Sequence, residues 1–157
     1  MKVQSGKFEV SEERGSVSFL SLSPLSARAI LGLAHGAGAG MDHQNMEAIA
    51  QAMASVGIAT LRYNFSYMEM GKGRESSQVS IATVKKAAIF ASQHFADLPL
   101  LMGGHSYGGR MSTLAAAEGF STPVEGLILF NFPLHAPGKP SLDRAAHLKN
   151  ISVPSLF

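Results

Sequence analysis

A serine placed between glycines is the residue of this chain with the clearest chemical potential. The run from Gly103 to Arg110 reads G-G-H-S-Y-G-G-R and contains a G-x-S-x-G pattern centred on Ser106. Gly104 and Gly108 carry no side chains that would block a tight turn, so the serine hydroxyl can project away from the backbone. A hydroxyl so placed can attack a carbonyl carbon, whereas the alternative is an ordinary serine at a helix N-terminus. We predict that Ser106 is a nucleophile.

A second glycine-rich loop offers groups that would stabilise the negative charge formed by such an attack. The six residues from His35 read H-G-A-G-A-G, and Gly36 and Gly38 allow a close approach of the backbone. We expect the backbone N–H groups of Ala37 and Tyr107 to form an oxyanion hole, with His35 bracing the loop through a hydrogen bond. The alternatives are a phosphate-binding loop, although its G-x-G-x-x-G spacing is not matched, and a simple tight turn.

A serine nucleophile needs a general base, and the histidines are the residues to consider. His135 and His147 follow the last long strand that we predict, and either can act only as a substitute base. The side chain of His105 is expected to point away from Ser106, because the two residues are adjacent at the turn. We expect two further histidines on solvated helix surfaces: His43 and His94.

Three arginines lie near predicted strand ends or loops and allow two interpretations. Arg62, Arg74 and Arg110 can draw an anionic substrate toward the site, or they can hold the fold by hydrogen bonds to backbone carbonyl groups. The second interpretation is the commoner role of arginines near loops, and the sequence favours it.

The elements that must position these residues alternate between strands and helices. Apolar runs of strand length predict strands over 3–10, 15–22, 28–34, 58–63, 99–102, 124–130 and the start of another over 151–157. Helical spacing predicts helices after Asp42 as N-cap through Ala54, over 79–91, over 111–118 and over 141–149, with loops over 64–77 and 133–140. The first two strands are expected to form an antiparallel hairpin. The remaining alternation predicts an α/β fold with a mostly parallel sheet and helices on both faces.

Composition limits the class of protein. The chain has 157 residues, 46% hydrophobic and 15% charged, which predicts one folded domain over residues 1–157. A net charge of +2 from scattered basic residues gives no argument for nucleic acid or membrane binding. No cysteine is present and no metal or organic cofactor is implied. The N-terminus lacks the apolar core of a signal peptide, so we expect a cytoplasmic protein.

Four segments resemble small α/β-hydrolases related to dienelactone hydrolases, and in particular the family shared by a testis-expressed hydrolase-like protein and a subunit of a chromatin acetyltransferase complex. The segments are 33–43, 61–65, 103–110 and 132–140. The resemblance extends from about residue 28 to the end and implies an esterase-type serine hydrolase with a small-molecule ester or lactone substrate. It departs from the family at His105 and Tyr107, where lysine and methionine are frequent.

The same resemblance implies catalytic parts that this sequence does not contain. Family members continue beyond the strand over 151–157 to an acid, a helix and a loop with the base histidine. We therefore expect an α/β-hydrolase fold truncated at its C-terminus, without the last strand or strands and helix, and inactive or weakly active because losing the histidine costs about 10⁶ in kcat. The alternative is a non-catalytic binding or scaffold module. An exposed edge strand over 153–157 can also promote dimers.

Overall fold

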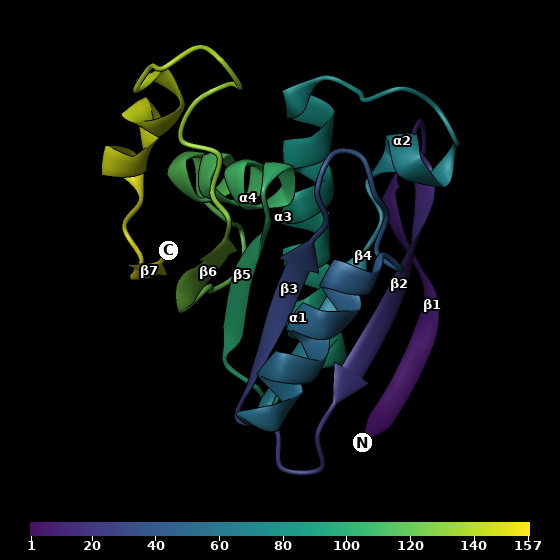
Figure 1. Cartoon of the computed structure of the whole chain (residues 1–157). Helices are drawn as coiled ribbons and strands as arrows, with labels where there is room; N and C mark the ends of the chain where they lie inside the picture. Colours follow the sequence, from purple (N-terminus) through teal and green to yellow (C-terminus); the bar gives the residue numbers. More distant parts are fainter.

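Five parallel strands form the centre of the fold, and an antiparallel hairpin extends one edge (Figure 1). The computed structural model describes residues 1–157, and its single sheet has the order β1-β2-β4-β3-β5-β6-β7. The strands are β1 (Lys2–Ser11), β2 (Gly15–Ser23), β3 (Ala29–Ala34), β4 (Ile58–Tyr63), β5 (Leu100–His105), β6 (Gly126–Phe130) and β7 (Ser155–Leu156). The helices are α1 (Gln44–Ser55), α2 (Ser66–Glu69), α3 (Ser77–His94), α4 (Tyr107–Glu118) and the 3₁₀ helix η1 (Asp143–Asn150). The predicted α/β class and mostly parallel sheet are confirmed.

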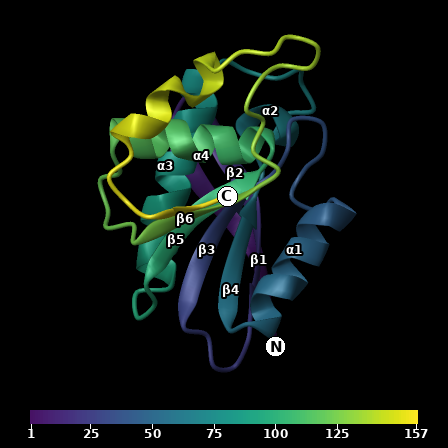
Figure 2. The same cartoon turned by 60° about the vertical axis from the view of Figure 1, so that its left-hand side comes forward.

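Helices cover both faces of this sheet, as predicted. α1 packs against β4 and β2 on one face, whereas α3 and α4 pack against each other and against β5 on the opposite face (Figure 2). Alternate residues of β3 therefore enter different layers: Ile30 joins the core beneath α3 and α4, and Leu31 joins the cluster beneath α1 with Met46. This two-sided burial explains why the central strands read as continuous apolar runs.

The sequence-based boundaries of several elements were wrong. α1 begins after His43, not after Asp42, because the His43 ring Nδ1 accepts a hydrogen bond from the Asn45 N–H at 3.2 Å. The predicted loop over 64–77 contains the short helix α2, in which Glu69 accepts hydrogen bonds from Ser18 and Asn64. These hydrogen-bond partners of Glu69 lie outside the helix itself, so the spacing of apolar residues in the sequence did not indicate α2.

The C-terminal part of the chain is more sparsely packed than the centre. The strand predicted over 151–157 contributes only β7, which pairs in parallel with β6 and is exposed at both residues. The helix predicted over 141–149 is the 3₁₀ helix η1, which packs on α4 without a fully buried residue. None of the helices combines the length and the hydropathy that crossing a bilayer requires.

Candidate active site

Ser106 is the single residue that joins β5 to α4. Its backbone has φ 51° and ψ −113°, a region that residues with a Cβ rarely adopt and that costs about 1–3 kcal/mol. Two hydrogen bonds hold this conformation: the Ser106 N–H donates to the Phe130 carbonyl at 2.8 Å, and its carbonyl accepts from the Arg110 N–H at 3.1 Å. The side chain makes no capping hydrogen bond to α4. Ser106 therefore occupies the N-cap position of α4 but does not cap the helix through its side chain.

Two glycines are required for β5 and α4 to pack closely against the end of β3. A Cβ on Gly104 would lie 2.6 Å from the Ala34 carbonyl oxygen, and one on Gly108 would lie 2.6 Å from the His35 carbonyl oxygen. Both are backbone atoms that cannot move aside. In the other loop, a Cβ on Gly36 would meet the His105 ring at 3.3 Å, and one on Gly38 would meet nothing within 4 Å. The steric requirement for glycine is therefore strict at the serine and relaxed at Gly38.

His35 fixes the loop that faces the serine. Its ring is fully buried; Nδ1 donates to the Gly36 carbonyl at 2.7 Å, and Nε2 accepts from the Phe65 N–H at 3.1 Å. Burial lowers the pKa of His35 to about 4, although the bond to Gly36 opposes that shift. The ring is thus neutral at pH 7 with both nitrogens engaged. It supports the loop and has no free nitrogen with which to accept a proton.

The serine and the glycine-rich loop share a cavity of about 530 Å³, whose walls include Ser106, Tyr107 and Ala37. The N–H of Ala37 donates no hydrogen bond within the chain, and the first N–H groups of α4 have no partners inside the helix. The Tyr67 hydroxyl donates to the Ala37 carbonyl at 3.0 Å, which holds the loop in place. Two unpaired N–H donors beside the positive end of a helix suit the binding of an oxyanion.

A chain of hydroxyl groups holds the Tyr107 side chain. The Tyr107 hydroxyl donates to Ser80 Oγ at 3.0 Å, and Ser80 in turn donates to Glu75 Oε1 at 2.9 Å. Burial raises the pKa of Glu75, and the hydrogen bond from Ser80 partly offsets this effect. Glu75 also lines the cavity, a role that the sequence did not predict because it lies in a polar loop without a motif.

The histidines near Ser106 differ in which of its cavities they line. His135 lines the 530 Å³ cavity, whereas His147 bonds through Nε2 to Thr113 Oγ1 at 2.8 Å and is not among the residues of its wall. A second cavity of about 310 Å³ also reaches Ser106, and its walls include His43 and His105. None of these rings forms a hydrogen bond with the Ser106 hydroxyl.

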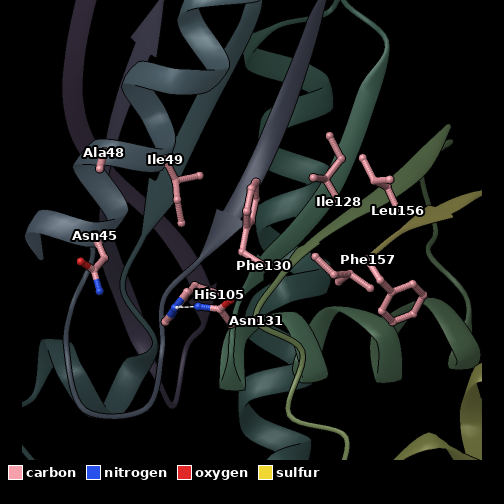
Figure 3. A pocket seen from close by; sticks show the side chains of 10 residues that line it. Asn45, Ala48, Ile49, His105, Ile128, Phe130, Asn131, Leu156 and Phe157 are labelled. Carbon is pink, nitrogen blue, oxygen red and sulfur yellow. Dashed lines mark hydrogen bonds between the residues drawn. The ribbon is translucent and has the colours of Figure 1, made fainter.

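The His105 ring lies 3.2 Å from the Asn131 side-chain nitrogen, at one end of a third, more apolar cavity of about 670 Å³ (Figure 3). Ile49 of α1 and Phe130 of β6 face this cavity, with the exposed Leu156 and Phe157 at its far side. Apart from His105, it contains no titratable side chain. The largest of these three cavities therefore lies beside Ser106 and does not include it.

No group of three histidine, cysteine or acidic side chains is placed to hold a metal ion.

The arginines separate into two roles. Arg62 is buried, forms an ion pair with Glu47 and donates to the Met41 carbonyl at 3.3 Å, so it holds the fold. Arg74 and Arg110 line the 530 Å³ cavity together with Arg144, which the sequence did not single out because η1 carries no strong pattern.

Known proteins share this architecture. The model of a family described as "Alpha/beta hydrolase domain" matches residues 27–157. Among solved structures, a dienelactone hydrolase from Anabaena variabilis is 20% identical with a TM-score of 0.67, over 82% of this chain and 63% of that one. An alpha-beta serine hydrolase homologue from Coxiella burnetii is 19% identical with a TM-score of 0.73, over 96% and 71%.

A highly thermostable carboxyl esterase from Bacillus coagulans is 19% identical with a TM-score of 0.68, over 82% of this chain and 44% of that one. The chain thus spans less than two thirds of the length of the dienelactone hydrolase and of the esterase. Among curated proteins, none matches the sequence. At these identities the solved structures show a common fold.

Proposed function

The chain belongs to the alpha/beta hydrolase domain family, and on that basis we propose that it is a serine hydrolase of esterase type acting on a carboxylic ester or lactone. The observation that carries this proposal is the conformation of Ser106. Ser106 is held at φ 51° between β5 and α4 and lines the same cavity as Ala37, whose N–H donates no hydrogen bond within the chain. This arrangement suits acyl transfer.

The reaction proceeds in two steps. Ser106 Oγ attacks the carbonyl carbon of the ester as its proton passes to a base, and the Ala37 and Tyr107 N–H groups bind the oxyanion of the tetrahedral intermediate. The intermediate collapses, the alcohol leaves with a proton, and an acyl-serine remains. Water then hydrolyses the acyl-serine and releases the carboxylic acid. Loss of one such N–H donor costs about 10²–10³ in kcat.

The supply of the base sets the rate of this reaction. No histidine of the chain forms a hydrogen bond with Ser106, although His135, His43 and His105 line its two cavities. We therefore propose that residues 1–157 by themselves react slowly, since an oxyanion hole and binding alone give a residual acceleration of about 10³–10⁴ over water. The same observation supports a second candidate function, a non-catalytic binding module that retains the hydrolase fold.

Labelling with a fluorophosphonate probe separates the two functions. We expect the purified chain to be labelled at Ser106, with no labelling of Ser106→Ala and unchanged labelling of Ser121→Ala, which alters an exposed serine after α4. Slow labelling that is specific for Ser106 supports the hydrolase. A folded, monodisperse chain without labelling at Ser106 contradicts it and favours the binding module.

Four less specific expectations extend this proposal. We propose a single domain over residues 1–157, a cytoplasmic location, and kinship with the dienelactone-hydrolase-like group. We also propose that two copies associate through the exposed edge at β7, where Leu156 is 65% and Phe157 is 62% exposed. Sedimentation velocity tests the last point: a dimer that Leu156→Lys abolishes supports it, and a monomer at all concentrations contradicts it.

A further inference from the structure

Three arginines from three separate elements meet in the cavity at Ser106. Arg74 lies in the loop before α3, Arg110 lies on α4 one turn after the serine, and Arg144 lies on η1. All three line the 530 Å³ cavity whose wall also contains Ser106. The second cavity at the serine, of about 310 Å³, contains no arginine. Positive charge is therefore concentrated on one side of the serine.

These guanidinium groups have no carboxylate partners in the chain. The four ion pairs of the structure involve other basic residues, and none of the three guanidinium groups donates a hydrogen bond to another residue. The Nε atom of Arg110 is buried without a hydrogen-bond partner, which costs about 1–3 kcal/mol or more for a charged group. The common role of arginine in holding loops through backbone carbonyl groups is thus not realised here.

Few contacts within the chain neutralise the three guanidinium charges at the cavity. Arg74 lies over the Tyr107 ring with its Cζ atom 5.2 Å from the ring centroid, so its charge is held at the cavity by a cation–π contact. The one carboxylate in the cavity wall is that of Glu75, whose Oε1 accepts a hydrogen bond from Ser80 and whose Oε2 is buried without a partner. Glu75 forms none of the four ion pairs of the structure. Burial first, and then the charges of Arg144 and Arg74, lower the pKa of Arg110. The positive charges of Arg74 and Arg144 therefore repel that of Arg110.

We propose that this cavity binds an anionic group, a carboxylate or a phosphate, that the ester substrate carries beside its reactive carbonyl. The proposal deepens the proposed function and rests on it, because Ser106 and the three arginines share one cavity. Guanidinium groups pair with carboxylate and phosphate through two parallel hydrogen bonds, and an anion would also give buried Arg110 Nε the partner it lacks. A substrate anchored in this way presents its carbonyl to Ser106.

Binding can be measured without any reaction at the serine. We would titrate the 157-residue chain carrying Ser106→Ala with sodium succinate, with sodium phosphate and with neutral dimethyl succinate, and follow the backbone amides by NMR. We expect saturable shifts at Tyr107 and Arg110 with at least one anion and none with dimethyl succinate. Saturation by succinate alone assigns a carboxylate, by phosphate alone a phosphate, and by both a site for either group.

Charge variants test whether the arginines are responsible. Arg144 is half-buried on η1, and we expect Arg144→Gln to raise the anion Kd about tenfold. We expect the same increase for Arg110→Gln. Arg110→Lys keeps the charge without the planar fork and should bind with an intermediate Kd. Lys2→Gln removes the same charge from the exposed start of β1 and should change Kd less than about twofold. Circular dichroism verifies that each variant is folded.

Two results overturn the proposal. One is the absence of saturable shifts at Tyr107 and Arg110 with both anions, and the other is an equal loss of binding in Lys2→Gln and Arg144→Gln. Since every titration is done without the serine hydroxyl, these results do not depend on the reactivity of Ser106. Anion binding together with a failure of fluorophosphonate labelling would contradict the hydrolase while leaving the anion site in place.

Discussion

Replacing Ser106 with glycine should make the protein more stable, although it removes the proposed nucleophile. At φ 51° and ψ −113° a Cβ atom is strained, whereas glycine adopts this conformation as the mirror image of a common extended one. Relief of strain contributes about 1–3 kcal/mol, and the greater freedom of glycine in the unfolded chain subtracts about 0.4–1 kcal/mol. The hydroxyl makes no capping bond that could be lost. We expect a net gain of about 1 kcal/mol.

The matched control is Ser106→Ala, which also removes the hydroxyl but keeps the Cβ and hence the strain. An unfolding entropy of about 2.1 cal/mol/K per residue over the 157 residues makes 1 kcal/mol equivalent to about 3 °C in Tm. Differential scanning calorimetry should therefore place the Tm of Ser106→Gly about 3 °C above that of Ser106→Ala. Equal Tm values, or a lower value for Ser106→Gly, would refute the assignment of strain to this residue. Fluorophosphonate labelling should be absent from both variants.

Three further predictions concern the surroundings of the serine. Gly108→Ala should unfold or severely destabilise the chain, since the added Cβ would overlap backbone atoms. Gly38→Ala should change the free energy of unfolding by less than about 0.5 kcal/mol in urea titrations. Equal losses of stability in the two variants would contradict the steric argument. Burial raises the pKa of Glu69, but hydrogen bonds from neighbours including Ser18 outweigh it and bring the pKa to about 2, from 4.5. Its stabilisation, about 2 kcal/mol after screening by solvent, should be present above pH 4.5 and be lost as the pH falls toward 2, and Glu69→Gln should remove this dependence. His35 should remain neutral in NMR titrations until the pH approaches about 4. Because the folded chain binds this proton less readily than the unfolded chain, the free energy of unfolding should decline as the pH falls below 6.5. A His35 ring that titrates near 6.5 would disprove its burial.

The local geometry of the serine was predictable from residues adjacent in the chain. One serine joins a strand to a helix, and a glycine lies two residues before it and two residues after it. This pattern leaves few conformations that the backbone can adopt. The close contacts at Gly104 and Gly108 show why those two positions cannot carry a Cβ. The sequence did not show that Gly38 has room for a Cβ, because the space around this residue depends on segments that are distant in the sequence.

The environment of a titratable side chain was less predictable. His35 was expected to brace its loop, but its low pKa follows from full burial and from a hydrogen bond with Phe65, which lies 30 residues along the chain. The short helix α2 was not predicted for a similar reason, since Glu69 anchors it to Ser18 of β2, which lies 51 residues earlier in the chain. Contacts between segments far apart in sequence carry no periodicity that a reading of the sequence can detect.

The sequence by itself determined the alternation of strands and helices, the two glycine-rich loops and the position of the serine between them. Each of these depends on the period of apolar residues or on local backbone sterics, and both are properties of short segments. Only the tertiary structure decided which arginine holds the fold and which face the serine. Arg62 is buried against Glu47 because β4 packs on α1. Arg74 and Arg144 reach one cavity because the fold brings the loop before α3 and the helix η1 to the end of the sheet where α4 begins. A charge acquires its role from what surrounds it, and those surroundings form only when the chain has folded.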